Sequence, residues 1–213
     1  MPRYDACLID VYETVVTMDQ VRHLELLAER AGASPDDFCA QTGTWAERVT
    51  DGRAPLPEAM AAVLEALGRP AGEDAAAALA DADRELIVEL ATLPEDTVPF
   101  LEGLRAAGVR TAFVSNCNEN TRHLLDGLGL TGLVDELVLS CEVGVAKPDP
   151  RIYGVALDRL DVPPERAVLV DDLASYCESA EAFGMASVRI DRAGGTGDVD
   201  TLAGLAERLA GPT

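Results

Sequence analysis

The sequence predicts an α/β fold, in which a Rossmann-like, doubly wound parallel sheet carries a helical domain inserted after its first strand. Short continuous apolar runs occur near the start of the chain and again in its second half, where they alternate with helical stretches. Such runs are typical of strands buried on both faces of a parallel sheet. Between them, apolar residues recur at helical spacing. The chain has 213 residues, enough for one domain with an insertion or for two small domains.

Five apolar runs are the expected strands. They cover residues 6–9, 111–114, 137–139, 167–170 and 187–190. Several end abruptly at a polar residue, the first at Asp10, the second at Ser115 and the fourth at Asp171. The alternation of the later runs with helical stretches predicts βαβ units and therefore a parallel sheet.

The insertion is expected to hold about four helices over residues 16–92, because apolar side chains recur there every three or four positions. Ser34-Pro35-Asp36-Asp37 predicts a helix start, with a capping hydroxyl, a proline at the first helical position and acids in the first turn. Trp45 falls in one of these stripes and is interpreted as a core residue. Residues 1–15 and 93–213 then form the Rossmann-like core.

Composition excludes some partners. With 17 basic and 38 acidic residues, the net charge of −21 repels phosphate backbones, so we expect no nucleic-acid partner. No apolar run is long enough to cross a membrane and no signal peptide is recognised, so we expect a cytoplasmic protein without a membrane partner. The five cysteines form no C-x-x-C pair, which argues against a zinc site. Both a monomer and a homodimer fit the sequence.

Polar residues gather where the predicted strands end, and ligands of doubly wound sheets bind beyond those ends. They are Asp10, the Ser115-Asn116 pair, the Asp171-Asp172 pair, and Lys147 in the loop after the third strand. Each alone has an ordinary explanation as a helix cap or a solvated charge. Together they supply a nucleophile, hydrogen-bond donors, a cation and a carboxylate pair suited to Mg²⁺, which fits displacement at a phosphoryl group or a polarised carbon.

Four segments in order resemble the motifs of the haloacid dehalogenase (HAD) superfamily. They are Ile9-Asp10-Val11-Tyr12-Glu13-Thr14, Phe113-Val114-Ser115-Asn116, the segment from Ala146-Lys147-Pro148 to Tyr153, and Val170-Asp171-Asp172 with its trailing helix. The resemblance covers essentially the whole chain, and the insertion matches the position of the family's helical C1 cap.

The resemblance implies roles for these residues. Asp10 would attack a small anionic substrate and form an aspartyl intermediate. Ser115 and Asn116 would donate hydrogen bonds to a phosphoryl or carboxylate oxygen, and Lys147 would offset the negative charge. Mg²⁺ would be held by Asp10, the Tyr12 carbonyl oxygen and the Asp171-Asp172 pair, either of which could be the direct ligand. No organic cofactor is implied.

Tyr12 departs from the pattern of HAD phosphatases, which carry an aspartate there that protonates the leaving group and then activates water. A phenol with a pKa near ~10 is a poor base at neutral pH. The L-2-haloacid dehalogenases resemble this chain at that position, and a halide leaving group needs no proton. They are metal-independent, however, and do not share the Asp171-Asp172 pair. Their cap arginine has no evident counterpart here, although Arg22, Arg30, Arg48 and Arg53 are available.

The expected function is therefore hydrolysis through an aspartyl nucleophile, with a Mg²⁺-dependent phosphatase acting on a small phosphomonoester preferred. A metal-independent 2-haloacid dehalogenase is the alternative, and a weakly catalytic or non-catalytic binding protein is the third hypothesis. Glu13 replaces the usual glycine after Tyr12; it is expected to point to solvent at the cap hinge, or else to assist as a displaced acid or base. His23 and His123, the two histidines, are assigned no role.

Overall fold

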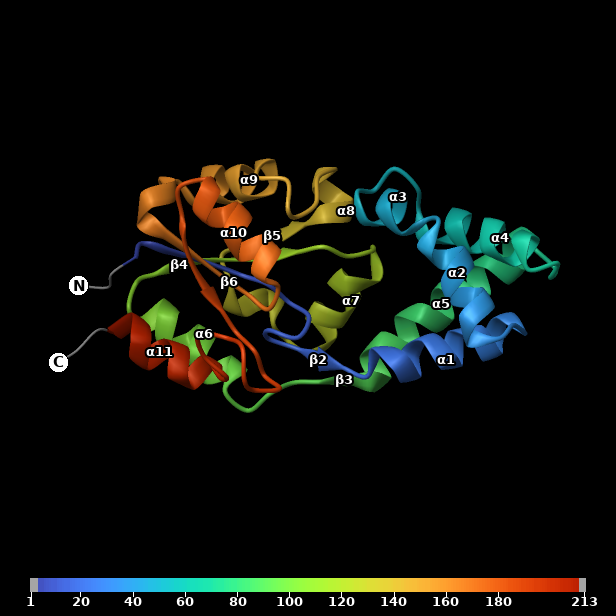
Figure 1. Ribbon diagram of the computed structural model, residues 1–213, viewed down its shortest axis with the longest axis horizontal. Coiled ribbons are helices and arrows are strands. Elements are labelled where there is room, and N and C mark those ends of the chain that lie inside the picture. The colour runs from blue at the N-terminus through green and yellow to red at the C-terminus, as the bar shows by residue number, and fades with distance from the viewer. Residues whose placement is uncertain (1–3, 211–213) are drawn as a thin grey trace.

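The computed structural model describes residues 4–210, and its centre is a five-stranded parallel sheet (Figure 1). The strand order is β5-β4-β1-β6-β7, which confirms the predicted fold class. The strands are β1 Ala6–Ile9, β4 Arg110–Ser115, β5 Glu136–Leu139, β6 Ala167–Asp171 and β7 Ala186–Arg189. All five agree with the predicted runs to within one residue at each end. Within the described residues, no helix combines the length and the apolar character that crossing a membrane requires.

Helices cover both faces of the sheet, as side chains that alternate along each strand require. In β1, Ala6 and Leu8 pack on one face and Cys7 and Ile9 on the other. The first face is covered by α9 (Arg151–Leu160) and α10 (Ala174–Ala182). The second is covered by α6 (Thr97–Ala106), α7 (Asn120–Gly127) and α11 (Leu202–Ala210). A short helix, α8 (Ser140–Val143), follows β5, and 3₁₀ turns cover Thr131–Leu133 and Pro164–Arg166.

The inserted helices lie together at the end of the molecule away from the termini (Figure 1). They are α1 Gln20–Ala31, α2 Pro35–Gly43, α3 Ala46–Thr50, α4 Leu56–Ala66 and α5 Glu73–Leu90. Their apolar stripes face one another and form a separate hydrophobic cluster. We propose that this group of helices, residues 20–90, is a cap over the core.

One helix expected in the cap is divided into α2 and α3, so the cap has five helices instead of four. Ser34 caps the start of α2, where its hydroxyl accepts from the amide of Asp37, as predicted. The helix ends at Gly43, and the Thr44 hydroxyl donates to the carbonyl oxygen of Gln41. Glycine and threonine are weak helix formers, and a hydroxyl bonded back to the backbone competes with the helical hydrogen bonds.

Two short strands join the cap to the core. They are β2 (Thr17–Met18) and β3 (Ala91–Thr92), which pair antiparallel. Glu13 precedes them in the left-handed backbone region, with φ of 59°, a conformation that explains why glycine suits this position. Its carboxylate accepts a hydrogen bond from the amide of Met18 at 3.2 Å. Glu13 therefore braces the turn into the hinge instead of pointing freely into solvent.

Candidate active site

The sheet order brings three polar strand ends together. Strand β1 lies between β4 and β6, in parallel register with both. Asp10 follows β1 directly, Ser115 is the last residue of β4, and Asp171 is the last residue of β6. All three are almost completely buried. The residues singled out at separate points of the sequence thus meet at one edge of the sheet.

Lys147 links two of these strand ends. Its ammonium group is buried and donates to Asp10 Oδ1 and to Asp171 Oδ2, both at 2.6 Å. Burial by itself lowers the pKa of Lys147, but the attraction of the two carboxylates outweighs it, so the pKa lies above its usual value. Lys147 therefore carries a positive charge at the centre of the site.

The three carboxylates of Asp10, Asp171 and Asp172 form a group suited to a metal ion, with one oxygen of each lying within 4.8 Å of the others. Three carboxylates against one ammonium leave two negative charges, which a divalent cation would neutralise. Burial raises the pKa of Asp10 to about 7, against the attraction of Lys147 and with a smaller contribution from the repulsion of Asp171 and Asp172. Burial and the charge of Asp171 also raise the pKa of Asp172. The donors and their charge fit Mg²⁺.

Asp171 and Asp172 differ in how their oxygens are used. Asp171 Oδ2 accepts from Lys147 and Asp171 Oδ1 accepts from the amide of Leu173 at 3.0 Å. Asp172 is half-buried, and it reaches the same group of carboxylates. Both oxygens of Asp171 thus accept hydrogen bonds within the protein.

Asn116 has partners within the protein. Its amide nitrogen donates to the carbonyl oxygen of Lys147 at 2.7 Å, and its amide oxygen accepts from the Lys147 backbone N–H at 2.7 Å. The amide nitrogen also lies 3.1 Å from the Tyr176 hydroxyl. The sequence predicted a donor to the substrate; in the structure the side chain clamps the backbone that carries Lys147, so we propose that Asn116 positions the lysine.

Two hydroxyls remain without partners among the described residues. Ser115 Oγ at the end of β4 and Thr14 Oγ1 in the loop after β1 are buried and make no hydrogen bond there. A buried hydroxyl without a partner is costly, and it is explained when a bound ligand supplies the missing acceptor. Ser115 is thus free for the donor role predicted for it, and Thr14 is a candidate that the sequence reasoning did not single out.

Tyr12 reaches α7, the helix after β4. Its hydroxyl lies 3.0 Å from Thr121 Oγ1. Burial raises the pKa of this phenol above its usual value, despite the hydrogen bond with Thr121. Tyr12 therefore stays protonated at neutral pH, so it can donate a proton and cannot serve as a base.

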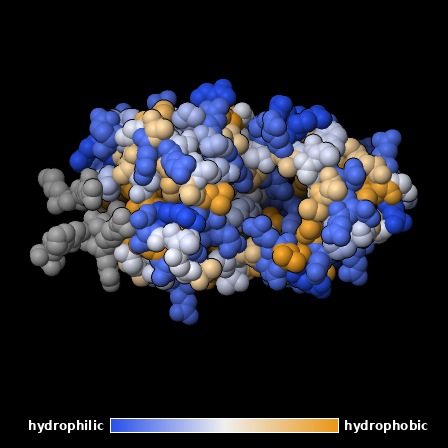
Figure 2. Space-filling model, in the orientation of Figure 1, coloured by the Kyte–Doolittle hydropathy of each residue, from blue (hydrophilic) through white to orange (hydrophobic). Residues whose placement is uncertain are grey.

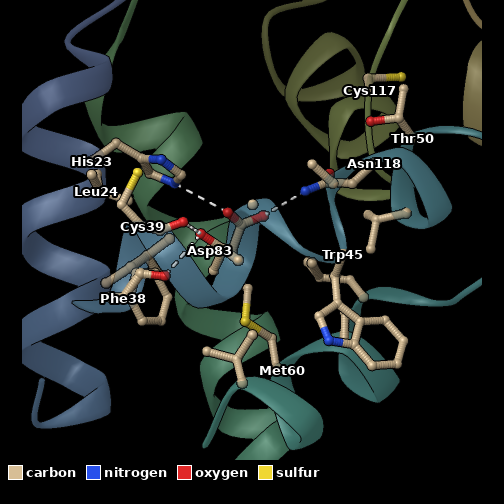
Figure 3. A pocket seen from close by; sticks show the side chains of 18 residues that line it. His23, Leu24, Phe38, Cys39, Trp45, Thr50, Met60, Asp83, Cys117 and Asn118 are labelled. Carbon is tan, nitrogen blue, oxygen red and sulfur yellow. Dashed lines mark hydrogen bonds and ion pairs between the residues drawn. The ribbon is translucent and has the colours of Figure 1, made fainter. Parts of the chain in front are cut away.

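A buried polar network ties the cap to the core (Figure 3). Asp83 of α5 accepts from the side-chain amides of Asn118 at 3.1 Å and Asn120 at 2.8 Å, both in the segment after β4. His23 Nε2 of α1 lies 3.1 Å from the other oxygen of Asp83. The sequence held one signal for this network, since Asp83 falls on the buried stripe of its helix. His123, by contrast, is exposed.

The four cap arginines considered for anion binding lie at the surface. Arg22 pairs with Glu25, Arg48 with Glu58, and Arg53 with Glu47 and Asp51. None of these four arginines lines a described pocket at the cap–core boundary. Arg151 of the core does line one, beside Lys147 and Asn116, and it pairs with Asp149. The buried positive charge at the strand ends is that of Lys147.

Comparison with known proteins places these features in one family. Residues 4–184 match the haloacid dehalogenase-like hydrolases. A curated (S)-2-haloacid dehalogenase from a Pseudomonas strain is 43% identical over 105 residues, 49% of this chain and 46% of the relative. A phosphatase from Mycobacterium tuberculosis is 35% identical over 105 residues, which are 48% of this chain and 48% of the relative. The chain thus spans about half the length of these curated relatives.

The likeness to solved structures extends over nearly the whole chain. The crystal structure of a HAD phosphatase from Thermococcus onnurineus has a TM-score of 0.72 and 25% identity, and covers 97% of this chain and 98% of that chain. Relatives of both activities, dehalogenase and phosphatase, are therefore similar to this sequence.

Proposed function

The chain belongs to the haloacid dehalogenase-like hydrolases, and we propose that within this family it is a Mg²⁺-dependent phosphatase acting on a small phosphomonoester. The observation that carries the proposal is the group formed by Asp10, Asp171 and Asp172, whose excess negative charge matches a divalent cation. A metal-independent dehalogenase does not require this excess negative charge.

Asp10 and Asp172 are the proposed direct ligands of Mg²⁺, together with the Tyr12 carbonyl oxygen that the family resemblance suggests. Asp171 would act through water, because Lys147 and the Leu173 amide already use its oxygens. The cation would supply charge neutralisation for the phosphoryl group. It would also lower the pKa of Asp10 from about 7 and so favour the ionised nucleophile.

In the first half of the proposed reaction, a carboxylate oxygen of Asp10 attacks phosphorus and the bond from phosphorus to the alcohol oxygen breaks. Lys147, 2.6 Å from Asp10, holds the nucleophile in place and offsets the charge of the phosphoryl group. The unpartnered hydroxyl of Ser115 donates to a phosphoryl oxygen. The leaving alcohol oxygen takes its proton from water, because the Tyr12 hydroxyl lies against Thr121 and burial raises its pKa, which makes it a weak acid.

The second half needs a base to activate the water that hydrolyses the aspartyl phosphate, and Tyr12 cannot provide one. Glu13 holds the amide of Met18 at the hinge, which supports a bracing role. We therefore expect hydrolysis of the intermediate to be slow relative to its formation. A Glu13→Gln variant is expected to keep the turnover of wild type; a clear loss would make Glu13 the missing base.

A metal-independent 2-haloacid dehalogenase remains the second candidate, favoured by Tyr12 and by the 43% identity to a dehalogenase. That chemistry needs no proton for the leaving halide. It does need a cationic group for the substrate carboxylate, and the cap arginines at the surface are poorly placed for this.

One experiment distinguishes the two candidate functions. Phosphate release from p-nitrophenyl phosphate and chloride release from 2-chloropropionate are measured with Mg²⁺ and with EDTA, for wild type and Asp10→Asn. Phosphate release that needs Mg²⁺ and disappears in Asp10→Asn supports the phosphatase. Chloride release that survives EDTA, without phosphate release, overturns it. The absence of both favours a binding protein.

A further inference from the structure

A pocket of about 340 Å³ lies inside the cap, next to its boundary with the core. Its wall is mainly apolar and comes from α1, α2, α3 and α4 (Figure 3). The large apolar side chains on it are Leu24, Leu27, Phe38, Trp45, Met60 and Val63. On the molecular surface, a hollow with hydrophobic residues at its rim marks the region where cap and core meet (Figure 2).

The volume of this pocket suits a sizeable apolar group. A dry cavity of roughly 150 Å³ lined by leucine, isoleucine and phenylalanine is large enough to bind benzene. The cap pocket has about twice that volume. Natural ligand pockets begin at about 300 Å³ and are mostly apolar with a few polar groups. An aromatic or alkyl group of about two rings in size would therefore fit.

Several polar groups of the pocket already have partners within the protein, and His23 Nε2 faces Asp83 without a hydrogen bond. Asp83 accepts from Asn118 and Asn120 and lies beside His23. The hydroxyl of Thr42 donates to the carbonyl oxygen of Phe38 at 3.0 Å. A sugar or a nucleobase would find few free partners here, and its own polar groups would be buried unpaired at a cost. The negative charge of Asp83 would also repel an acidic ligand.

The cap pocket adjoins a second pocket at the boundary with the core. A neighbouring pocket of about 310 Å³ is lined by Tyr12, Asn116 and Thr121 on the core side. Four residues line both pockets, namely His23, Asp83, Cys117 and Asn118. Tyr12 and Asn116 follow Asp10 and Ser115 closely in the sequence, so this second pocket lies between the cap pocket and the strand ends.

We propose that the cap pocket binds the apolar part of the alcohol that the substrate loses, so that the preferred substrate is a phosphomonoester of an apolar alcohol. The phosphate would lie at the strand ends and the apolar group in the cap. The reaction in this proposal rests on the proposed phosphatase function. The choice of an apolar alcohol rests on the pocket alone.

The kinetic test compares n-alkyl phosphates from methyl to octyl, with glycerol phosphate as a polar control. The KM is expected to fall with each added methylene group by up to about four-fold, the change equivalent to ~0.8 kcal/mol of apolar burial. Glycerol phosphate should behave like the shortest members. A KM that is independent of chain length among hydrolysed substrates overturns the proposal.

The binding test does not depend on turnover, because Trp45 is the only tryptophan of the chain and lines the pocket. In the Asp10→Asn variant, octyl phosphate is expected to change the fluorescence of Trp45 saturably, while methyl phosphate should not. If octyl phosphate binds in this way but no phosphomonoester is hydrolysed, the phosphatase proposal fails and the pocket proposal stands. If phosphomonoesters are hydrolysed but octyl phosphate does not change the fluorescence of Trp45, the phosphatase proposal stands and the pocket proposal fails.

Pocket-filling variants give the structural control. Ala59→Phe places a ring on a buried wall position, and Gly43→Leu adds a side chain where a Cβ meets no atom within 4 Å. Both should weaken octyl phosphate binding far more than methyl phosphate turnover. Gly103→Leu, at an equally open helical glycine in α6, is the matched control. Octyl phosphate binding that is unaffected by both filling variants overturns the proposal.

Discussion

Replacing Lys147 with methionine removes the ammonium group that lies 2.6 Å from Asp10 and from Asp171. Methionine keeps a similar side-chain length, so the change mainly removes charge. Breaking a buried ion pair by removing one partner costs about 3–5 kcal/mol, because the remaining charge is left buried and unpaired. Here two carboxylates lose the same partner, so we expect a loss of this size in the free energy of unfolding at pH 8 without metal.

The loss should depend on pH. Burial already raises the pKa of Asp10 to about 7, above its value of ~3.9 in an unfolded chain. Without Lys147 this pKa rises further, so the destabilisation is greatest above pH 7 and shrinks as the carboxylates take up protons toward pH 5. Equilibrium unfolding in urea, followed by circular dichroism in the presence of EDTA, measures the loss in the free energy of unfolding at pH 8 and at pH 5.

Two further variants make the test specific. Adding Asp171→Asn to Lys147→Met removes one of the repelling charges and should restore part of the stability. Arg151→Met, at the start of α9, removes a surface cation that pairs with Asp149 and should leave the unfolding midpoint unchanged. Equal stability of Lys147→Met and wild type at pH 8, or a greater loss at pH 5 than at pH 8, would refute the reasoning.

Four other outcomes are expected. Saturating Mg²⁺ should stabilise the folded protein by about 2.7 kcal/mol at one hundred times its Kd, and a thermal shift that persists in Asp172→Asn would contradict the assigned ligand. Because ionised Asp10 is the proposed nucleophile, kcat/KM should rise as pH increases through about 7 at low Mg²⁺, and the midpoint should move lower as Mg²⁺ is added. A pH profile insensitive to Mg²⁺ would argue against metal beside Asp10. Because hydrolysis of the intermediate is expected to be slow, wild type should release alcohol in an initial burst. Tyr12→Asp should increase phosphatase turnover and abolish this burst, and stopped-flow absorbance with p-nitrophenyl phosphate measures both. Asp83→Ala leaves the amides of Asn118 and Asn120 without their acceptor, so the free energy of unfolding should fall by about 1–3 kcal/mol, as measured in urea.

The strands were predictable because burial on both faces leaves a continuous apolar run that ends where the chain reaches the sheet edge. The same logic placed Asp10, Ser115 and Asp171 at one edge before any contact was known. The division of one cap helix into α2 and α3 was harder to predict, because it depends on weak local preferences at Gly43 and Thr44.

The partners of polar side chains were the part that sequence reasoning missed. Asn116 was expected to face the substrate, yet it clamps the backbone of Lys147, which is 31 positions away in the sequence. Asp83 meets His23 within the cap and Asn118 across the cap–core boundary. Such contacts depend on how the cap sits on the core, and no local pattern encodes that arrangement.

The most direct test of Asp10 as the nucleophile of a phosphatase is the mass of the protein quenched in acid during turnover of p-nitrophenyl phosphate with Mg²⁺. Because hydrolysis of the intermediate is expected to be slow, a phosphoryl group should be found on the peptide that contains Asp10. It should be absent with EDTA and in Asp10→Asn. A phosphoryl group on another residue, or turnover without any phosphorylated protein, would contradict the proposed role of Asp10.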